Sequence, residues 1–396
     1  MRIGKANWVV GGIGCVFVAA CGGGNSSSGF GEVDLGPDGG GAPSETDGGG
    51  FASDTDGAGR LFSDASTTAH TGPKTCQADS DCGSGGLCDP STHVCSCGGT
   101  QIQASVVPPN LLLVMDRSCS MQDPIDGTPK WTIAANAISQ LAQQYAGRIR
   151  FGLEFLPDPN AGDDTCSVSR IEVPVGPGNE STIASLLTKS ISRSDPNYPS
   201  NPCTTPISSA LSEAAADSDL SDTSRPEFTA LITDGEETCA DANDGTIQTI
   251  TGMLQRGIKT FVVGFGSDAD PGSLNSFAAV GGVPNQSGPN QFYDATDQAG
   301  LQAALSSIAQ ASLSCTLQLQ QPLPGGDPSL LYVFFDKMAP AVTRDTTHQS
   351  GWDYDSTTDS ITIYGSSCDD LKSGKITDVE AVYGCAGSDA PPAPVQ

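Results

Sequence analysis

The chain has 396 residues, more than one typical domain, and its 46 acidic residues against 18 basic ones give a formal net charge of −28. This balance argues against nucleic acid as a partner, because phosphate binding depends on Lys and Arg, and against direct attraction to anionic lipid. Fourteen cysteines, mostly outside metal-finger spacing, indicate disulfides and an oxidising compartment. We therefore expect one sizeable exported domain with small attachments.

Residues 1–20 have the layout of an export signal, with a basic start, an apolar stretch from Trp8 and small residues before Cys21. The stretch is too short to be expected to span a membrane as a helix. Its end, "VAAC", resembles the lipobox of bacterial lipoproteins, which implies cleavage before Cys21 and acylation of that residue. An ordinary cleavage site after Ala20 is the alternative. Gly22 after the cysteine implies sorting to the outer membrane, on either the cell surface or the periplasmic face.

Two contrasting segments follow the signal. Residues 21–74 are rich in Gly, Ser and Asp and too poor in apolar residues to fold, so we predict a disordered tether. Residues 75–98 hold five cysteines in a span too short for a core, so cross-links must supply the order. The segment resembles small EGF-like or Dickkopf-like modules. Zinc is the competing interpretation, although Cys95 and Cys97 are spaced too tightly for the usual ligand pair and only His93 is nearby.

Residues 105–314 alternate between strand and helix patterns. The run from Asn110 to Asp116 is continuously apolar until its end, as in a strand buried on both faces. Further strands are predicted at residues 148–157, 170–175, 227–233 and 258–264. Helices are predicted at residues 130–147, at 180–191 with Asn179 as its cap, and from near Pro206, Thr246, Pro271 and Asp297. This alternation predicts an α/β fold: a doubly wound, mostly parallel, Rossmann-like sheet covered by helices on both faces.

Polar residues stand where the buried strands end. Asp116, Ser118 and Ser120 follow the first strand, Thr205 precedes a helix, and Asp234 follows the strand at 227–233. Because ligands bind at the carboxyl ends of the strands in such sheets, we expect these side chains to converge there.

This set of residues resembles the metal-ion-dependent adhesion site of von Willebrand factor A (VWA) domains, over residues 105–314. The resemblance implies that Mg²⁺, or Mn²⁺ or Ca²⁺, is bound directly by Ser118, Ser120 and Thr205 and mostly through water by Asp116 and Asp234. Such an ion takes octahedral oxygen ligands, and one open position would accept an acidic group from a protein partner. The alternative is that these Asp and Ser residues are ordinary turn formers.

Catalysis has little support in the sequence. The three histidines, His70, His93 and His348, lie outside the main domain, and no HExxH or Walker-type motif occurs. Arg117 is expected to be solvated. We predict that the protein is not an enzyme but a cell-envelope lipoprotein that binds a protein ligand through a divalent metal ion. The main alternative is a disulfide-rich structural or assembly component whose metal site is unused; a metal-assisted hydrolase comes third.

Residues 315–387 read as short strands between Pro, Gly and Asp turns, and predict a small β-rich extension. It resembles extensions of related bacterial surface lipoproteins. Its aromatic residues Trp352, Tyr354 and Tyr364 are expected to form a small core rather than a sugar-binding platform. Residues 388–396 are predicted to be a disordered tail.

Removal of the signal and acylation of Cys21 would leave twelve cysteines, enough for six bridges. Four of them are expected to close the small module: Cys76, Cys82, Cys88 and Cys95. Closeness along the chain or in the expected fold predicts the other pairs: Cys97–Cys315, Cys166–Cys203, Cys368–Cys385 and Cys119–Cys239. The last pair would clamp two metal-binding loops; the alternative is that Cys119 is a small buried thiol.

Overall fold

The structure is a computed structural model that describes residues 75–84, 86–90, 93–160, 166, 170–239, 242–385, 387 and 391–395. The predicted signal peptide, its lipidation residue Cys21 and the tether lie outside the described residues. Within the described part of the chain, no helix has both the length and the apolar character needed to cross a bilayer.

The main domain is built on a six-stranded sheet with the strand order β12-β11-β10-β5-β8-β9. Neighbouring strands run parallel except β9, which is antiparallel to β8. The strands are β5 (Asn110–Asp116), β8 (Arg150–Leu156), β9 (Arg170–Gly176), β10 (Glu227–Thr233), β11 (Ile258–Phe265) and β12 (Tyr293–Ala295). The predicted doubly wound, mostly parallel α/β fold is confirmed, with β12 as a strand that the sequence pattern did not predict.

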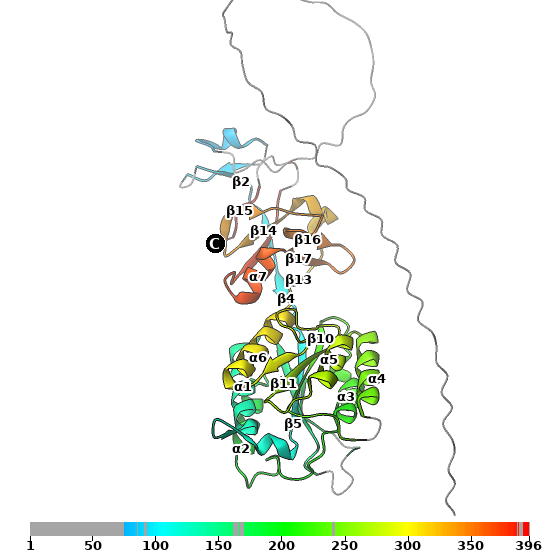
Figure 1. Cartoon of the computed structure of the whole chain (residues 1–396). Coiled ribbons are helices and arrows are strands. Elements are labelled where there is room, and N and C mark those ends of the chain that lie inside the picture. The colour runs from blue at the N-terminus through cyan, green and yellow to red at the C-terminus, as the bar shows by residue number, and fades with distance from the viewer. Residues whose placement is uncertain are drawn as a thin grey trace, which may run out of the picture. The chain divides into compact units, whose positions relative to one another are not determined.

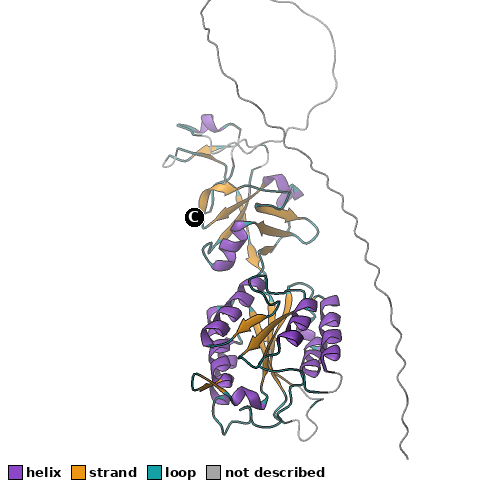
Figure 2. Ribbon diagram, in the orientation of Figure 1, coloured by secondary structure: helices purple, strands orange, loops and turns teal. Residues whose placement is uncertain are grey.

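Helices cover both faces of this sheet, as Figures 1 and 2 show. One face carries α1 (Lys130–Gln144), α2 (Glu180–Ser190) and α6 (Gln298–Ser312), and the other carries α3 (Ile207–Ala216), α4 (Ala242–Gln255) and α5 (Pro271–Val280). A two-stranded hairpin, β6 (Pro124–Ile125) and β7 (Thr128–Pro129), precedes α1. Asn179 was expected to cap α2, but its side-chain amide donates to the carbonyls of Phe151 and Pro174 instead.

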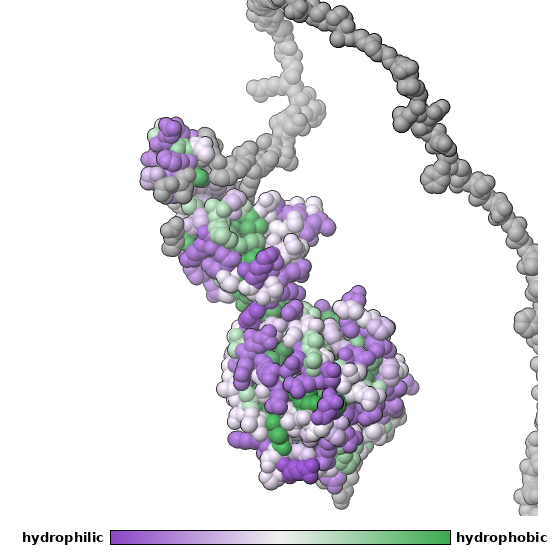
Figure 3. Space-filling model, turned by 60° about the vertical axis from the view of Figure 1, so that its left-hand side comes forward, coloured by the Kyte–Doolittle hydropathy of each residue, from purple (hydrophilic) through white to green (hydrophobic). Residues whose placement is uncertain are grey.

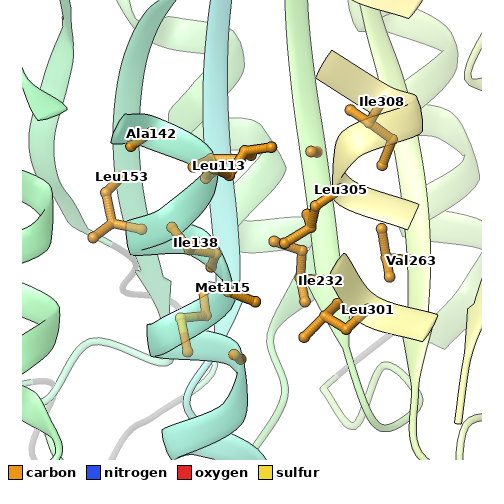
Figure 4. Packing of buried hydrophobic residues seen from close by; sticks show 14 of the residues in the cluster. Leu113, Met115, Ile138, Ala142, Leu153, Ile232, Val263, Leu301, Leu305 and Ile308 are labelled. Carbon is orange, nitrogen blue, oxygen red and sulfur yellow. The ribbon is translucent and has the colours of Figure 1, made fainter. Parts of the chain in front are cut away.

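The apolar run of β5 fills two cores. Successive side chains of a strand point to opposite faces, so Leu113 and Met115 enter one core while Leu112 and Val114 enter the other. Figure 4 shows the first two residues packed beneath α1, where Ile138 lies over the sheet. This two-sided burial explains why the strand lacks the alternating pattern of a half-exposed strand.

The second domain is a β sandwich that the main domain interrupts. β3 (Thr100–Ile102) and β4 (Ala104–Val106) precede the main domain, yet β3 pairs with β18 and β4 pairs with β13. The two sheets have the orders β16-β17-β13-β4 and β15-β14-β18-β3. Their later strands are β13 (Thr316–Leu319), β14 (Leu331–Phe335), β15 (Met338–Val342), β16 (Gly351–Asp355), β17 (Ser360–Tyr364) and β18 (Val379–Tyr383), with α7 (Ser366–Ser373).

This arrangement changes two predicted boundaries. The main domain begins with β5 at Asn110 rather than at residue 105, and the extension at 315–387 takes one strand for each sheet from before that domain. β3 and β4 are edge strands of three residues each, which is too short for a hydrophobic alternation to be recognised in the sequence. The main domain is therefore an insertion in the β sandwich.

The sandwich core includes Trp352, which is 1% exposed and donates its indole N–H to the carbonyl of Val342 at 2.8 Å. Burial of this ring confirms its expected structural role. The predicted loose end of the chain is wrong for its described part. The carbonyl of Pro391 accepts a hydrogen bond from the Cys97 amide, and the Val395 amide donates to the Glu380 carboxylate at 3.1 Å.

The small N-terminal module consists of η1 (Asp79–Cys82), β1 (Leu87–Cys88) and β2 (Cys95–Ser96). Bridges Cys76–Cys88 and Cys82–Cys95 close it, as expected for a unit without a large core. Sulfur atoms of Cys76, Cys82 and Cys88 lie close together, but all three belong to bridges and so are not thiolate ligands for zinc. The structural-disulfide interpretation of the module is confirmed.

All twelve cysteines named above form bridges, but the predicted pairs outside the small module are wrong. The structure contains Cys97–Cys385 and Cys315–Cys368 in the sandwich, in place of Cys97–Cys315 and Cys368–Cys385. The physical reason is the pairing of β3 with β18, in which Thr100 faces Tyr383. This register brings Cys97, three residues before β3, close to Cys385, two residues after β18. The other two bridges lie at the candidate site.

Candidate metal centre

The carboxyl ends of β5 and β10 bring the two predicted aspartates together. Asp116 is the last residue of β5, and Asp234 directly follows β10, its neighbour in the sheet. The helix that follows β5 packs on one face of the sheet and the helix that follows β10 packs on the other. Loops diverge at such a switch point and leave room for a ligand at the sheet edge.

A continuous set of hydrogen bonds joins the oxygen atoms at this edge. The hydroxyl oxygens of Ser118 and Ser120 lie 3.0 Å apart, and Ser120 donates to Asp234 Oδ1 at 2.8 Å. Asp116 Oδ1 accepts from the Ser118 amide at 2.7 Å, and its Oδ2 accepts from the Thr233 hydroxyl at 2.6 Å. Each side chain is thereby held in one orientation by a neighbour.

Thr205 reaches the same edge from the loop before α3. Its amide donates to the Thr238 hydroxyl at 2.6 Å, and a Cβ placed on Gly235 would lie 4.0 Å from Thr205 Oγ1. The buried carboxylate of Glu237, which the sequence did not single out, accepts from the Ser208 amide at 2.7 Å. Through this hydrogen bond, Glu237 joins the loop after Asp234 to the start of α3, and so keeps Thr205, which precedes α3, next to that loop. The structure thus brings all five predicted residues together.

This donor set fits a hard divalent cation. Neighbouring ligands on an octahedral Mg²⁺, each about 2.1 Å from the ion, are separated by about 3 Å. The 3.0 Å between the hydroxyl oxygens of Ser118 and Ser120 matches that separation. Carboxylate and hydroxyl oxygens are also the ligands that Mg²⁺ prefers over nitrogen or sulfur.

The electrostatics of the edge favour a cation. Burial and the nearby charge of Asp234 raise the pKa of Asp116 to about 7, against the opposing effect of the hydrogen bonds from Thr233 and Ser118. Two buried carboxylates close enough to interact repel each other, and positive charge near them reduces that repulsion. A divalent ion at the edge would relieve this repulsion.

Arg117 was expected to be solvated, and that prediction is wrong. Its side chain is buried and donates to three carbonyl oxygens, those of Pro157, Tyr198 and Asn201, at 3.0–3.1 Å. Burial lowers the pKa of Arg117 to about 10, so the guanidinium remains charged. In the sequence, the one hint that Arg117 has a structural role is its position between two candidate site residues, Asp116 and Ser118. Arg117 ties the first metal-site loop to the segment before Thr205.

Lys130, also unpredicted, reaches the site from the first turn of α1. Its ammonium donates to Asp234 Oδ2 at 3.0 Å and to Asp268 Oδ2 at 3.1 Å. Burial opposes the charge, but the hydrogen bonds and charges of the two aspartates together raise the pKa of Lys130 above its ordinary value. Asp234 is therefore held by Ser120 on one oxygen and by Lys130 on the other.

Two bridges stabilise the loops of the site, but not in the predicted pairs. The structure contains Cys119–Cys203 and Cys166–Cys239 instead of Cys119–Cys239 and Cys166–Cys203. Arg117 explains the difference, because its hydrogen bonds to Tyr198 and Asn201 draw that segment, and Cys203 with it, against the first loop. The clamp therefore joins the loop of Ser118 and Ser120 to the loop of Thr205.

The strand order, with one antiparallel edge strand, gives the main domain the fold of VWA domains. The five oxygen-bearing residues at its carboxyl edge resemble the metal-ion-dependent adhesion site of such domains. No family model matches the chain. An uncharacterized protein of Bacillus subtilis, YwmC, is 29% identical over 181 residues, which cover 44% of this chain and 74% of YwmC.

Solved structures with a similar fold were also found. Proximal thread matrix protein 1 from the mussel byssus is 11% identical, with a TM-score of 0.40; the match covers 54% of this chain and 48% of that protein. BatB from Bacteroides thetaiotaomicron is 14% identical, with a TM-score of 0.38, over 52% of this chain and 98% of BatB. The SpRpn10 VWA domain is 10% identical, with a TM-score of 0.35, over 51% of this chain and 95% of that domain.

Proposed function

We propose that this protein is an envelope lipoprotein, anchored through Cys21, whose VWA-type domain binds an acidic group of a protein ligand through Mg²⁺ or another divalent ion. The observation that carries the proposal is the 3.0 Å spacing of the Ser118 and Ser120 hydroxyls beside two buried aspartates. The hydroxyl ligands are neutral and add no negative charge to the ion, so a carboxylate of the partner can complete its coordination.

The surface of the main domain is consistent with binding a protein ligand through polar and charged contacts. Hydrophilic side chains cover much of its face in Figure 3, and apolar residues form only small separate areas there. Among the described residues, the large exposed apolar side chains are Leu87, Val106, Met338 and Val395, all outside the main domain. Charge at one edge, rather than a broad apolar patch, is therefore the basis for binding that we propose.

Asp116→Ala should abolish metal binding while the domain stays folded. We expect one Mg²⁺ or Mn²⁺ per wild-type chain in isothermal titration calorimetry, and at least about a hundredfold weaker binding by the variant, since a buried carboxylate is lost. Capture of an envelope protein by the purified chain should likewise be lost on adding a chelator. Asp116→Ala removes an acceptor from two buried donors, the Ser118 amide and the Thr233 hydroxyl, at a cost of about 1–3 kcal/mol, so circular dichroism must confirm folding.

Asp123→Ala is the matched control, because Asp123 lies on the same loop but is exposed. It should bind metal like the wild type. A folded wild-type protein that takes up neither ion contradicts the proposal and favours the alternative, a disulfide-rich structural or assembly component, for which the six bridges are the supporting observation. We also propose that the protein is not an enzyme, since His93 and His348 both lie outside the main domain.

Cys21→Ser should release the protein from membranes. Each buried CH₂ of an acyl chain contributes about 0.8 kcal/mol, so two or more chains would hold even a strongly acidic protein. Fractionation of cells that express the variant measures the effect, with Cys15→Ser as a control inside the signal. Variant protein that still sediments wholly with the membrane would contradict lipid anchoring.

A further inference from the structure

Lys130 is a buried cation shared by two carboxylates of very different exposure. The side chains of Lys130 and Asp234 are 3% and 0% exposed, whereas that of Asp268 is 67% exposed. Solvent screens the charge of Asp268, so its pairing with Lys130 is weak. The strong partner of Lys130 is therefore Asp234, one of the five candidate metal-site residues.

The backbone around Lys130 leaves space for its side chain and holds its main chain in place. A Cβ on Gly266 would lie 2.9 Å from Lys130 Cε, and Gly266 has φ +95°, a conformation that favours glycine. The Lys130 amide donates to the carbonyl of Asp123 at 3.0 Å, which fixes the start of α1 against the first metal-site loop. Backbone and side chain of Lys130 thus both contact the loops of the site.

We propose that Lys130 is a positioning residue that neutralises Asp234, so that a bound divalent ion keeps a net positive charge for the acidic group of the ligand. This inference rests on the proposed function. Counting these groups alone, Asp116 and Asp234 bring two negative charges, Lys130 brings one positive charge and the ion brings two, which leaves one positive charge. Without Lys130, the two aspartates would balance the ion completely.

Other charges near the site do not replace Lys130. Arg117 lies beside Asp116, but its charge also interacts with Asp158 and Glu172. Its guanidinium N–H groups donate to three backbone carbonyl oxygens and not to a carboxylate of the site. Among the residues that the structure describes, Lys130 is the cation that forms an ion pair with Asp234.

The charge balance predicts that loss of the Lys130 charge has opposite effects on the binding of the metal ion and on the binding of the carboxylate ligand. Removing the charge of Lys130 removes repulsion toward the metal ion, so metal binding tightens. The same change lowers the positive charge that attracts a carboxylate, so acid binding weakens. A purely structural role predicts something else: loss of Lys130 would loosen Asp234 and weaken both.

The test compares Lys130→Met with the wild type, using Mn²⁺ and acetate as probes. Electron paramagnetic resonance of free Mn²⁺ gives the metal Kd, and broadening of the ¹³C signal of the acetate carboxylate by the Mn²⁺-loaded protein gives the acetate Kd. We expect Mn²⁺ binding about tenfold tighter and acetate binding about tenfold weaker, as for one unit charge a few ångströms away in a partly screened site. Lys259→Met, at an exposed position at the start of β11, is the control for net charge and should leave both constants unchanged.

Lys130→Gln guards against misfolding, because it removes the charge but keeps a donor for Asp234; it should give the same opposite shifts. If either folded variant weakens both ligands, or changes neither, the charge-setting role of Lys130 is wrong while the metal site stands. If the wild-type protein itself binds no Mn²⁺, the proposed function fails and this inference fails with it.

Discussion

Glu154→Met should make the protein more stable at pH 8 than the wild type, with the gain shrinking steadily as the pH falls toward 4.5. Glu154 lies in the middle of β8, is fully buried, and has no hydrogen-bond partner for either carboxylate oxygen among the described residues. Its neighbours across the sheet are Val114 and Ile171, both apolar. An ion in these surroundings is costly, so the neutral acid is the form that the fold favours.

Burial, and then the charges of Glu213 and Asp217, raise the pKa of Glu154 well above its ordinary value. A carboxyl group with a raised pKa in the folded state binds more protons when folded than when unfolded. Stability is therefore fully present below the unfolded pKa near 4.5 and is lost as the pH rises, by up to about 1.4 kcal/mol for each pH unit. Methionine has a similar volume and does not ionise, so this loss should disappear.

Urea unfolding at intervals from pH 4 to 9 measures the effect as the difference between the two proteins. Asp116 and Glu227 also have raised pKa values of about 7, but they titrate equally in both proteins and cancel in that difference. Glu154→Gln, which is neutral but polar, should also flatten the profile. Curves for wild type and Glu154→Met that stay parallel across the whole range would show that Glu154 does not govern the pH dependence.

Replacing both Cys97 and Cys385 with serine should destabilise the β sandwich by about 3–5 kcal/mol, because their bridge spans 288 residues and closing so long a loop costs the unfolded chain much entropy. Both residues must change, since one alone would leave a reactive thiol. Calorimetry should show the unfolding transition of the sandwich lowered by more than about 12 °C, since 1 kcal/mol shifts a domain of this size by about 4–8 °C.

The matched control removes Cys76 and Cys88, whose bridge spans only 12 residues within the small module. That change should leave the transition of the sandwich within about 2 °C of the wild type. A transition that is equally unaffected in the Cys97 and Cys385 variant would mean that pairing of β3 with β18 suffices without the bridge.

The fold of the main domain follows from the sequence because each signal is local, whereas the five candidate metal-site residues follow from the resemblance of their pattern to VWA domains. The apolar run that ends at Asp116 marks a buried strand, and polar residues at strand ends must gather at the carboxyl edge of a parallel sheet. Ser118, Ser120 and Asp234 therefore needed no knowledge of distant contacts. The order of elements places these residues at one edge of the sheet, but their interpretation as metal ligands, together with Thr205, rests on the family resemblance.

The residues that the sequence did not reveal depend on contacts far apart along the chain. Arg117 binds carbonyls about 40 to 84 positions away, and Lys130 pairs with Asp234 across 104 positions. Cysteine pairing failed for the same reason: nearness in sequence pointed to Cys368–Cys385, whereas strand register joined Cys97 to Cys385. Strands as short as β3 and β4 carry too few residues for a hydrophobic pattern.

The insertion of the main domain into the sandwich has a mechanical consequence. β4 leads into the main domain and β13 leads out of it, and the two strands are antiparallel neighbours with Val106 facing Leu317. A pull on a ligand held at the candidate metal site would reach Cys97 by two covalent routes. One runs back through β4 and β3, and the other runs forward through the sandwich and across the Cys97–Cys385 bridge. Because both routes end at the same residue, tension is divided between them, and neither β3 nor β4 can be peeled away alone while the ring stays closed.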